Sequence, residues 1–147
     1  MKEAVRLFHL AADQDDGLAK RNLGLCYHFG KGVARDMTES IRWYRLAADQ
    51  GVALAQNMLG FLYLYGIGVP ANEKESVRLL QLAVDQNEPG SQYNLGICYQ
   101  NGHGVSKNEK EALRLFRLAA EQGKANAQCN VGFYYNNGKG VSEDGKE

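Results

Sequence analysis

The chain has 147 residues, and its 17 Lys and Arg residues balance its 17 Asp and Glu residues. A formal charge of zero gives no reason to expect a nucleic acid or an acidic membrane as partner. No uninterrupted apolar run is long enough to span a bilayer, so we expect no membrane insertion.

The first residues already belong to a repeated pattern. Residues 1–6 include Glu3 and do not resemble a secretion signal. Three cysteines make an odd set, and two of them, Cys26 and Cys98, lie two repeats apart. Because packed helices are spaced roughly 8–10 Å apart, these two lie beyond the ~7 Å limit for a disulfide. We therefore expect free thiols, which slightly favours a cytoplasmic location and leaves the compartment open.

A pattern with a period of 36 residues runs through the whole chain. Its clearest parts are an apolar-Gly pair and a Gly-x-Gly-Val stretch. The pair occurs at Leu23-Gly24, Leu59-Gly60, Leu95-Gly96 and Val131-Gly132, and the stretch ends at Val33, Val69, Val105 and Val141. A fixed period of this length is typical of stacked helical units that bind along an extended surface.

The first helix of each unit is predicted to begin with a capping box. Asp36 precedes Glu39 by three residues, and the arrangement returns at Asn72–Glu75, Asn108–Glu111 and Asp144–Glu147. The helix behind Asp36 places Ser40, Trp43 or Tyr44, and Ala47 on one buried face. It ends at Gln50-Gly51, with Asn87 replacing the glycine in the next unit. Asp16-Gly17 shifts the glycine by two, so we expect the first turn to differ.

The second helix of each unit is predicted to run approximately over residues 53–65, with a face of Ala55, Leu59, Leu62 and Tyr63 in the core. A glycine in mid-helix, such as Gly60, costs ~1 kcal/mol relative to Ala. Its recurrence indicates that another backbone passes close by, and we expect the column of Ala47 to be the counterpart. Pro70 and Pro89 fall at unit edges. The prediction is an all-α solenoid, an α-α superhelix of about four antiparallel helix pairs without strands.

The same residues resemble the Sel1-like repeat family, a relative of the tetratricopeptide repeats. The positions that carry the resemblance are Trp43, Tyr44, Ala47, Ala48, Gly51, Ala53, Ala55, Leu59, Gly60, Tyr63, Gly66, Gly68 and Val69. In this family's phase the chain is one repeat domain, 1–147. It divides into a partial unit 1–16, units 17–52, 53–88 and 89–124, and a partial unit 125–147. No capping unit is visible, which favours a piece of a longer array or an engineered repeat segment.

Columns that vary between the units are candidates for partner binding. By resemblance to the tetratricopeptide repeats, the second helix lines the concave face, and positions 21, 25, 28 and 29 share one stripe along it. The candidate groove residues are Arg21, Leu25, His28, Phe29, Asn57, Phe61, Leu64, Tyr65, Tyr93, Ile97, Gln100, Asn101, Phe133 and Asn136. The apolar column at 25, 61, 97 and 133 has two open interpretations, an anchor for the partner or packing between units.

The other recurrent residues have structural explanations. Arg6, Arg42, Arg78 and Arg114 each follow a Glu by three residues, which predicts solvated ion pairs rather than a basic ridge. The glycine loops lack the Lys-Ser/Thr ending of a nucleotide-binding loop. His9, His28 and His103 occupy three different frame positions, which disfavours a metal site. We expect no catalytic residue, cofactor or metal.

The predicted function is a non-catalytic scaffold that binds a protein or peptide in its concave groove. An alternative is an array segment that mainly self-associates through uncapped ends. A hydrolase of the penicillin-binding type is a remote alternative, implied by cysteine-rich relatives in the family. Those relatives carry a cysteine pair in each unit, which this chain lacks, and no serine here has a Lys three residues on.

Overall fold

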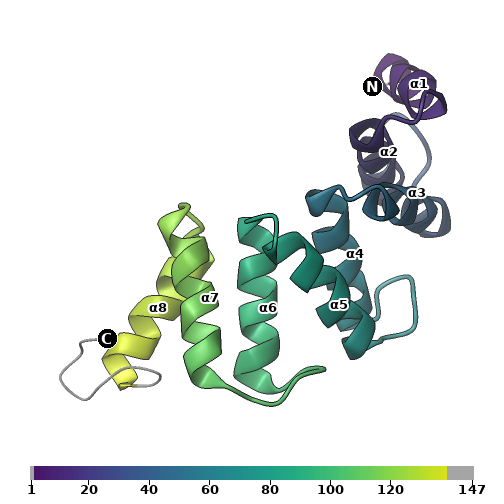
Figure 1. Cartoon of the computed structure of the whole chain (residues 1–147). Helices are drawn as coiled ribbons and strands as arrows, with labels where there is room; N and C mark the ends of the chain where they lie inside the picture. Colours follow the sequence, from purple (N-terminus) through teal and green to yellow (C-terminus); the bar gives the residue numbers. More distant parts are fainter. Residues whose placement is uncertain (1, 139–147) are drawn as a thin grey trace.

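The computed structural model describes residues 2–138 and contains eight helices and no strand within that range. The helices are α1 (Lys2–Asp13), α2 (Gly17–Phe29), α3 (Met37–Asp49), α4 (Ala53–Tyr65), α5 (Glu73–Val84), α6 (Pro89–Asn101), α7 (Glu109–Glu121) and α8 (Ala125–Asn137). Consecutive helices pack on each other, and the array follows a curved path with α1 and α8 at its opposite ends (Figure 1). This confirms the predicted helical solenoid. We call α1, α3, α5 and α7 the first helices and α2, α4, α6 and α8 the second helices.

Only one of the two hydrogen bonds of each capping box forms. The side chains of Asp36, Asn72 and Asn108 each accept a hydrogen bond from the backbone N–H three residues on, at 3.1 Å. The glutamate at that position does not return the bond, because the N–H of the capping residue donates instead to a tyrosine carbonyl of the preceding helix. The glutamates bind Arg42, Arg78 and Arg114. This confirms the predicted ion pairs, while the fourth box, at Asp144, lies outside the described residues.

The turns after the first helices keep one geometry with different residues. Gly51 and Gly123 have φ values of 86° and 88°, and Asn87 takes the same left-handed position with φ 64°. In the first turn this position is held by Asp15 with φ 70°, while Gly17 begins α2. The expected difference in the first turn is therefore a difference in residue type. The turn itself is retained because Asp and Asn tolerate left-handed geometry better than other side chains.

The glycines inside the second helices are required by close packing, but not against the residue that the sequence suggested. A Cβ at Gly60 would lie 2.9 Å from the side chain of Leu80. The Ser76 hydroxyl donates to the carbonyl of Gly60 at 2.6 Å. The first helix that follows in the chain therefore approaches at its Ser76 and Leu80 positions. The prediction that the Ala47 column is the counterpart is wrong, and Ala47 is buried elsewhere, in the cluster with Ala55.

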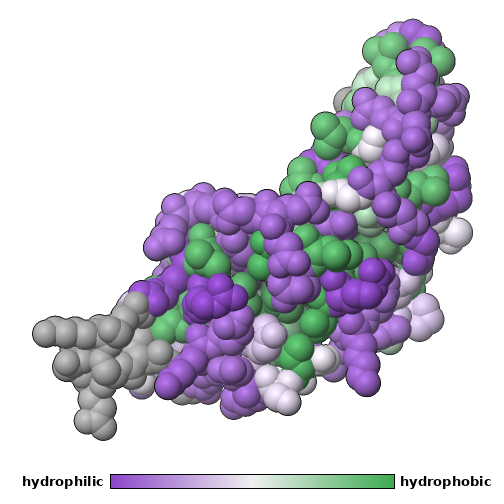
Figure 2. Space-filling view, in the orientation of Figure 1, coloured by the Kyte–Doolittle hydropathy of each residue, from purple (hydrophilic) through white to green (hydrophobic). Residues whose placement is uncertain are grey.

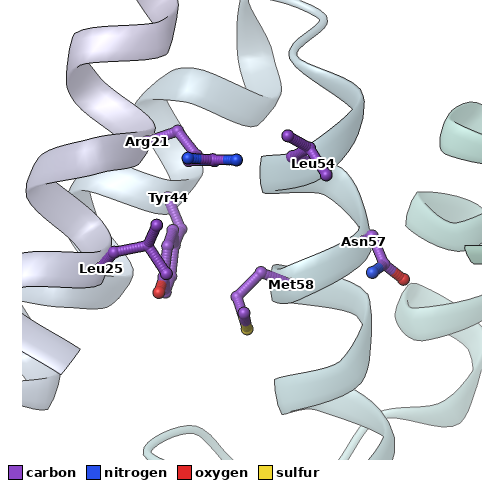
Figure 3. A pocket seen from close by; sticks show the side chains of 6 residues that line it. All are labelled: Arg21, Leu25, Tyr44, Leu54, Asn57 and Met58. Atoms are coloured by element: carbon purple, nitrogen blue, oxygen red, sulfur yellow. The ribbon is translucent and has the colours of Figure 1, made fainter. Parts of the chain in front are cut away.

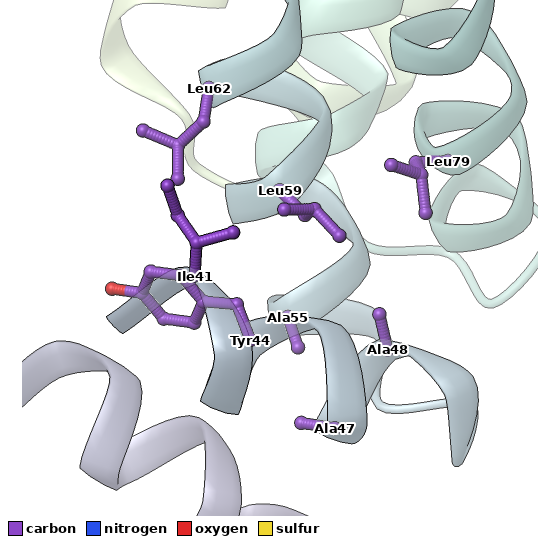
Figure 4. Close-up of a cluster of buried hydrophobic side chains, with 8 residues drawn as sticks. All are labelled: Ile41, Tyr44, Ala47, Ala48, Ala55, Leu59, Leu62 and Leu79. Atoms are coloured by element: carbon purple, nitrogen blue, oxygen red, sulfur yellow. The ribbon is translucent and has the colours of Figure 1, made fainter. Parts of the chain in front are cut away.

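The core is a strip that continues from unit to unit. One cluster joins Tyr44 of α3, Leu59 of α4 and Leu79 of α5 (Figure 4). Similar clusters lie before and after it along the array. Tyr63, which we expected in this core, is only half buried, and its hydroxyl accepts a hydrogen bond from Arg45 at 2.9 Å. The apolar face of each unit is thus covered by the neighbouring units, as expected for a solenoid.

Candidate binding groove on the second helices

The second helices meet along one side of the array. Apart from packing on the first helices, α4 also contacts α6 directly. Three hollows lie between neighbouring second helices, and the space-filling view shows hydrophobic side chains exposed between hydrophilic ones over the middle of the array (Figure 2). We call the line of these hollows the groove.

Hollow 1 lies between α2 and α4. Its walls come from Arg21 and Leu25 on one side and from Leu54, Asn57 and Met58 on the other, and its floor includes Tyr44 (Figure 3). The Tyr44 side chain is fully buried, and burial raises the pKa of its hydroxyl to about 12. This hydroxyl and His28 Nδ1 lie at a hydrogen-bond distance of 3.1 Å. The floor of the hollow is therefore fixed by packing and by a polar contact.

Hollow 2 adjoins hollow 1, because both include Asn57 and Met58. His28 and Phe29 form its wall on α2, and their rings stack with centroids 4.3 Å apart. Phe61 completes it on α4, together with Asn94 from α6. The hollow offers about 370 Å³, which is enough for a large apolar side chain.

Hollow 3 repeats hollow 2 two units further along. Gln100 takes the frame position of His28, and Cys129, Asn130 and Phe133 take those of Asn57, Met58 and Phe61. Its volume is also about 370 Å³. The side chain of Phe133 is 54% exposed, compared with a half-buried Phe61. The same backbone frame thus presents a more polar lining at this end of the groove.

A comparison with family models matches the Sel1 repeat at residues 1–16, 17–52, 53–88, 89–124 and 125–147. The chain belongs to the Sel1 repeat family. Proteins of this family generally mediate protein–protein interaction, and the Sel1 repeat fold is typically a non-catalytic scaffold.

Solved structures of other Sel1 repeat proteins share the fold. A Sel1 repeat protein from Oxalobacter formigenes is 35% identical with a TM-score of 0.89, over 95% of this chain and 57% of that one. The protective antigen c5321 of uropathogenic Escherichia coli is 36% identical with a TM-score of 0.87, over 92% of this chain and 29% of that one. The chain therefore spans about half of the first protein and less than a third of the second.

A third solved structure supports the fold alone. Cysteine rich protein B of Helicobacter pylori is 20% identical with a TM-score of 0.70, over 89% of this chain and 96% of that one. No curated protein matches the chain.

The groove residues expected from the Sel1 repeat pattern fall into three groups. Those that line the hollows are Arg21, Leu25, His28, Phe29, Asn57, Phe61, Gln100 and Phe133. Tyr65, Asn101 and Asn136 are exposed on the second helices beside them. Tyr93 and Ile97 are half buried and pack on the cluster around Phe116. Leu25 and Phe61, besides lining the hollows, pack on the cluster around Tyr44, so three members of the apolar column fit the alternative of packing between units.

Leu64 is a correction to the predicted groove. It is only 7% exposed and packs with Leu80 and Leu95 in the core. A leucine at this frame position turns inward, because burial of its side chain stabilises the fold by roughly 1.5–3 kcal/mol. The polar residues His28 and Gln100 at the same position stay partly exposed. We therefore leave Leu64 out of the groove.

Sequence reasoning missed the column next to position 21. Met58, Asn94 and Asn130 of this column line the hollows, and Asn94 Nδ2 donates to Asn57 Oδ1 at 2.9 Å across two helices. The signal was present, because asparagine is unusual in a helix interior and recurs here in three of the four units, at Asn22, Asn94 and Asn130. Variation between the units does not reveal this column, because its asparagine largely repeats.

The chemistry of the cysteines fits packing rather than reaction. Cys26 and Cys98 are buried, and within residues 2–138 all three cysteines are free thiols, as predicted. Burial raises the pKa of the Cys98 thiol to about 12, which removes its nucleophilic thiolate at neutral pH. Cys129 is exposed in the groove.

No group of three His, Cys, Asp or Glu side chains among the described residues could hold a metal ion. No helix of the described part is long and apolar enough to cross a bilayer.

Proposed function

We propose that the groove binds a peptide or protein segment and that the chain acts as a non-catalytic interaction scaffold. The observation that carries this proposal is the continuity of hollows 1 and 2, which share Asn57 and Met58. A bound segment can therefore place successive side chains in adjoining sites without leaving the surface. The walls combine aromatic rings with asparagine amides, which suits apolar anchoring together with hydrogen bonds to a peptide backbone.

Several aromatic side chains in the groove are held in place before a partner arrives. Phe61 contacts Tyr65 with ring centroids 4.9 Å apart, and Phe29 stacks on His28. Phe29 and Tyr65 are 57% and 52% exposed. Apolar surface that is exposed but already ordered costs little entropy on binding, which favours its use as a contact surface.

The test is a selection of random peptides displayed on phage against the chain, followed by affinity measurements with the selected peptides. We expect Phe61→Ala to weaken binding about tenfold or more, since aromatic anchors at the centre of an interface dominate the binding energy. The matched control is Leu82→Ala on α5, because Leu82 is 40% exposed and lies on a first helix, outside the hollows. If the selected peptides bind Phe61→Ala as tightly as the unchanged chain, the groove is not the binding surface.

Self-association is a second candidate, and one observation favours it. In the internal junctions a large side chain of the following first helix covers the glycine of each second helix. These pairs are Gly24 with Tyr44, Gly60 with Leu80 and Gly96 with Phe116. No atom of the described residues lies within 4 Å of a Cβ built at Gly132, on α8. At the other end, Leu7 of α1 is 50% exposed, whereas the equivalent Leu115 is fully buried.

In this candidate, α1 of a second copy covers Gly132 of the first as a first helix does within the chain, with Phe8 at the frame position of Tyr44, Leu80 and Phe116. Sedimentation velocity over a hundredfold dilution tests this proposal. We expect concentration-dependent association, which Gly132→Trp abolishes by filling the site. Leu82→Asp, on a first helix inside the array, is the control and should leave association unchanged. A monomer at every concentration would refute this candidate and leave the groove proposal intact.

A further inference from the structure

Charge is distributed unequally between the two kinds of helix. The second helices α2, α4, α6 and α8 contain no Asp or Glu, and their only Lys or Arg residues are Lys20 and Arg21 on α2. Each first helix, in contrast, carries at least two acidic residues. Although the whole chain is neutral, the helices that line the groove carry no carboxylate. An anionic partner is therefore not repelled by acidic side chains of these helices.

Three cations near α2 form no ion pair with a described carboxylate. Arg21 lines hollow 1, and Lys31 and Arg35 follow α2 in the chain. None of the three takes part in an ion pair within residues 2–138. The arginine column of the first helices differs in this respect, because each of its members is bound to the glutamate three residues earlier. The α2 end of the groove thus has three positive charges that no carboxylate of the described residues neutralises through an ion pair.

Lys31 and Arg35 are held close to the groove by contacts with α2. The ammonium of Lys31 lies over the Phe29 ring, 5.7 Å from its centroid. Arg35 Nε donates to the carbonyl oxygen of His28 at 3.0 Å. The pKa of His28 is lowered, first because the ring is partly buried and then because of the charge of Arg35. The permanent positive charges beside this wall of hollow 2 are therefore those of Arg35 and Lys31.

Arg21 is the cation placed directly in a hollow. Its side chain and Leu25 project from α2 toward the space that Leu54 and Met58 reach from α4 (Figure 3). It is half buried, and Nη1 donates to the neutral Asn22 Oδ1 at 2.7 Å. A guanidinium has five N–H donors in a fork that fits a carboxylate in a bidentate geometry. Most of these donors have no acceptor within the described protein, and apolar neighbours strengthen the attraction of an anion.

We propose that hollows 1 and 2 together bind a peptide segment in which a carboxylate lies next to an apolar side chain. The carboxylate accepts hydrogen bonds from Arg21 in hollow 1, and the apolar side chain fills hollow 2 between Met58, Phe61 and Phe29. The shared residues Asn57 and Met58 make the two sites adjacent, which requires that the acidic and the apolar group be neighbours in the partner. This inference rests on the groove as the binding surface and names the chemistry of its ligand.

The experiment records backbone amide spectra of the ¹⁵N-labelled chain during titration with short synthetic peptides. The probes are Ac-Gly-Ser-Leu-Glu-Ser-Gly-NH₂, the same peptide with Leu-Gln, the same peptide with Ser-Glu, and Ac-Gly-Ser-Gly-Ser-Leu with a free or an amidated C-terminus. We expect the Leu-Glu peptide to shift amides of α2 and α4 and to bind about tenfold more tightly than the Leu-Gln and Ser-Glu peptides. The free and amidated forms of the last peptide determine whether a terminal carboxylate serves as well as a side chain.

Two arginine substitutions make the test specific. Arg21→Gln should reduce the affinity for the Leu-Glu peptide about tenfold and leave that for the Leu-Gln peptide unchanged. Arg78→Gln on α5 is the control, because Arg78 is exposed on a first helix, outside the hollows, and bound to Glu75, and it should have no effect. Equal affinity for the Leu-Glu and Leu-Gln peptides on α2 and α4 would overturn the inference and leave the groove function standing. If no peptide shifts any amide of the second helices, the groove function itself fails.

Discussion

Substitution of the second-helix glycines by alanine tests how the solenoid is held together. The four glycines occupy one frame position, but their surroundings differ. A Cβ at Gly96 would lie 2.6 Å from the ring of Phe116, and one at Gly24 would approach the Tyr44 ring still more closely. A Cβ at Gly60 would lie 2.9 Å from Cγ and a methyl carbon of Leu80 and 3.3 Å from the carbonyl oxygen of Ser76, and Gly132 has no neighbour within 4 Å among the described residues. The chain therefore contains its own control.

The expected magnitudes follow from two opposing effects. Alanine gains ~1 kcal/mol over glycine in a helix interior. Overpacking a filled core costs typically ~1–3 kcal/mol, and the upper end applies where a rigid, buried ring must move. We expect Gly24→Ala and Gly96→Ala to lower the free energy of unfolding by about 1–2 kcal/mol, Gly60→Ala to lower it by less because an aliphatic side chain shifts more easily than a ring, and Gly132→Ala to raise the local stability of α8 by about 1 kcal/mol.

Urea unfolding followed by helical circular dichroism measures the first three effects as shifts of the midpoint at constant slope. Because units of a solenoid can unfold separately, amide hydrogen exchange in α8 measures the effect of Gly132→Ala. Four equal changes would refute the reasoning, since they would show that helix propensity alone matters at this position. A stabilised Gly96→Ala would refute the close approach of α7 to α6.

Three other outcomes are expected. Ser76→Ala removes the buried hydrogen bond to the Gly60 carbonyl and should cost about 1 kcal/mol in urea unfolding, whereas Ala112, at the same frame position and fully buried, should accept the reverse change Ala112→Ser without loss. N-ethylmaleimide should label the folded chain once, at the exposed Cys129, and three times after denaturation, which mass spectrometry counts. The pKa of Glu75 is lowered by the hydrogen bond from Arg78, so the pair stabilises the fold above the unfolded value near 4.5, and this is lost as pH falls through the folded pKa. Because both side chains are partly exposed, Glu75→Gln should cost less than ~0.5 kcal/mol at pH 7 in urea unfolding, and this cost should shrink as the pH is lowered below the unfolded value.

The sequence was sufficient for the helices because their signals are local. The caps at Asp36 and Asn72 and the asparagine in the left-handed turn at Asn87 act within a few residues of the backbone they fix. The close approach of another helix to Gly60 could also be predicted, because glycine destabilises a helix and yet recurs at this position in every unit. Its partner could not, because frame positions 40 and 47 lie on the same face of a first helix. Which of the two meets the glycine depends on the angle at which the helices cross, and that angle is set by the whole interface.

The groove was harder to predict because exposure depends on neighbouring units. His28 and Leu64 occupy one column, but the apolar Leu64 packs against Leu80 and Leu95 of later helices and is buried, whereas the polar His28 stays partly exposed beside Tyr44. The apolar column divides for the same reason, with Ile97 packed on the cluster around Phe116 and Phe133 left exposed. The repeat pattern predicts the same surroundings for every residue of a column. The surroundings of Leu64, however, include the side chains of Leu80 and Leu95, which lie 16 and 31 residues further along the chain.

The separation of roles between the two kinds of helix explains how one backbone can carry different surfaces. The junctions between units use the small residues Gly60 and Ser76 and one large side chain such as Leu80, all buried. The groove side chains also touch the core, since Leu25, Met58 and Phe61 pack on the cluster around Tyr44. The position of Met58 is nevertheless asparagine in the other three units. A change of lining therefore need not alter the spacing of the hollows. Under the proposed function, the binding preference along this array is set unit by unit, with the charge of Arg21 at the α2 end and neutral amides at the α8 end.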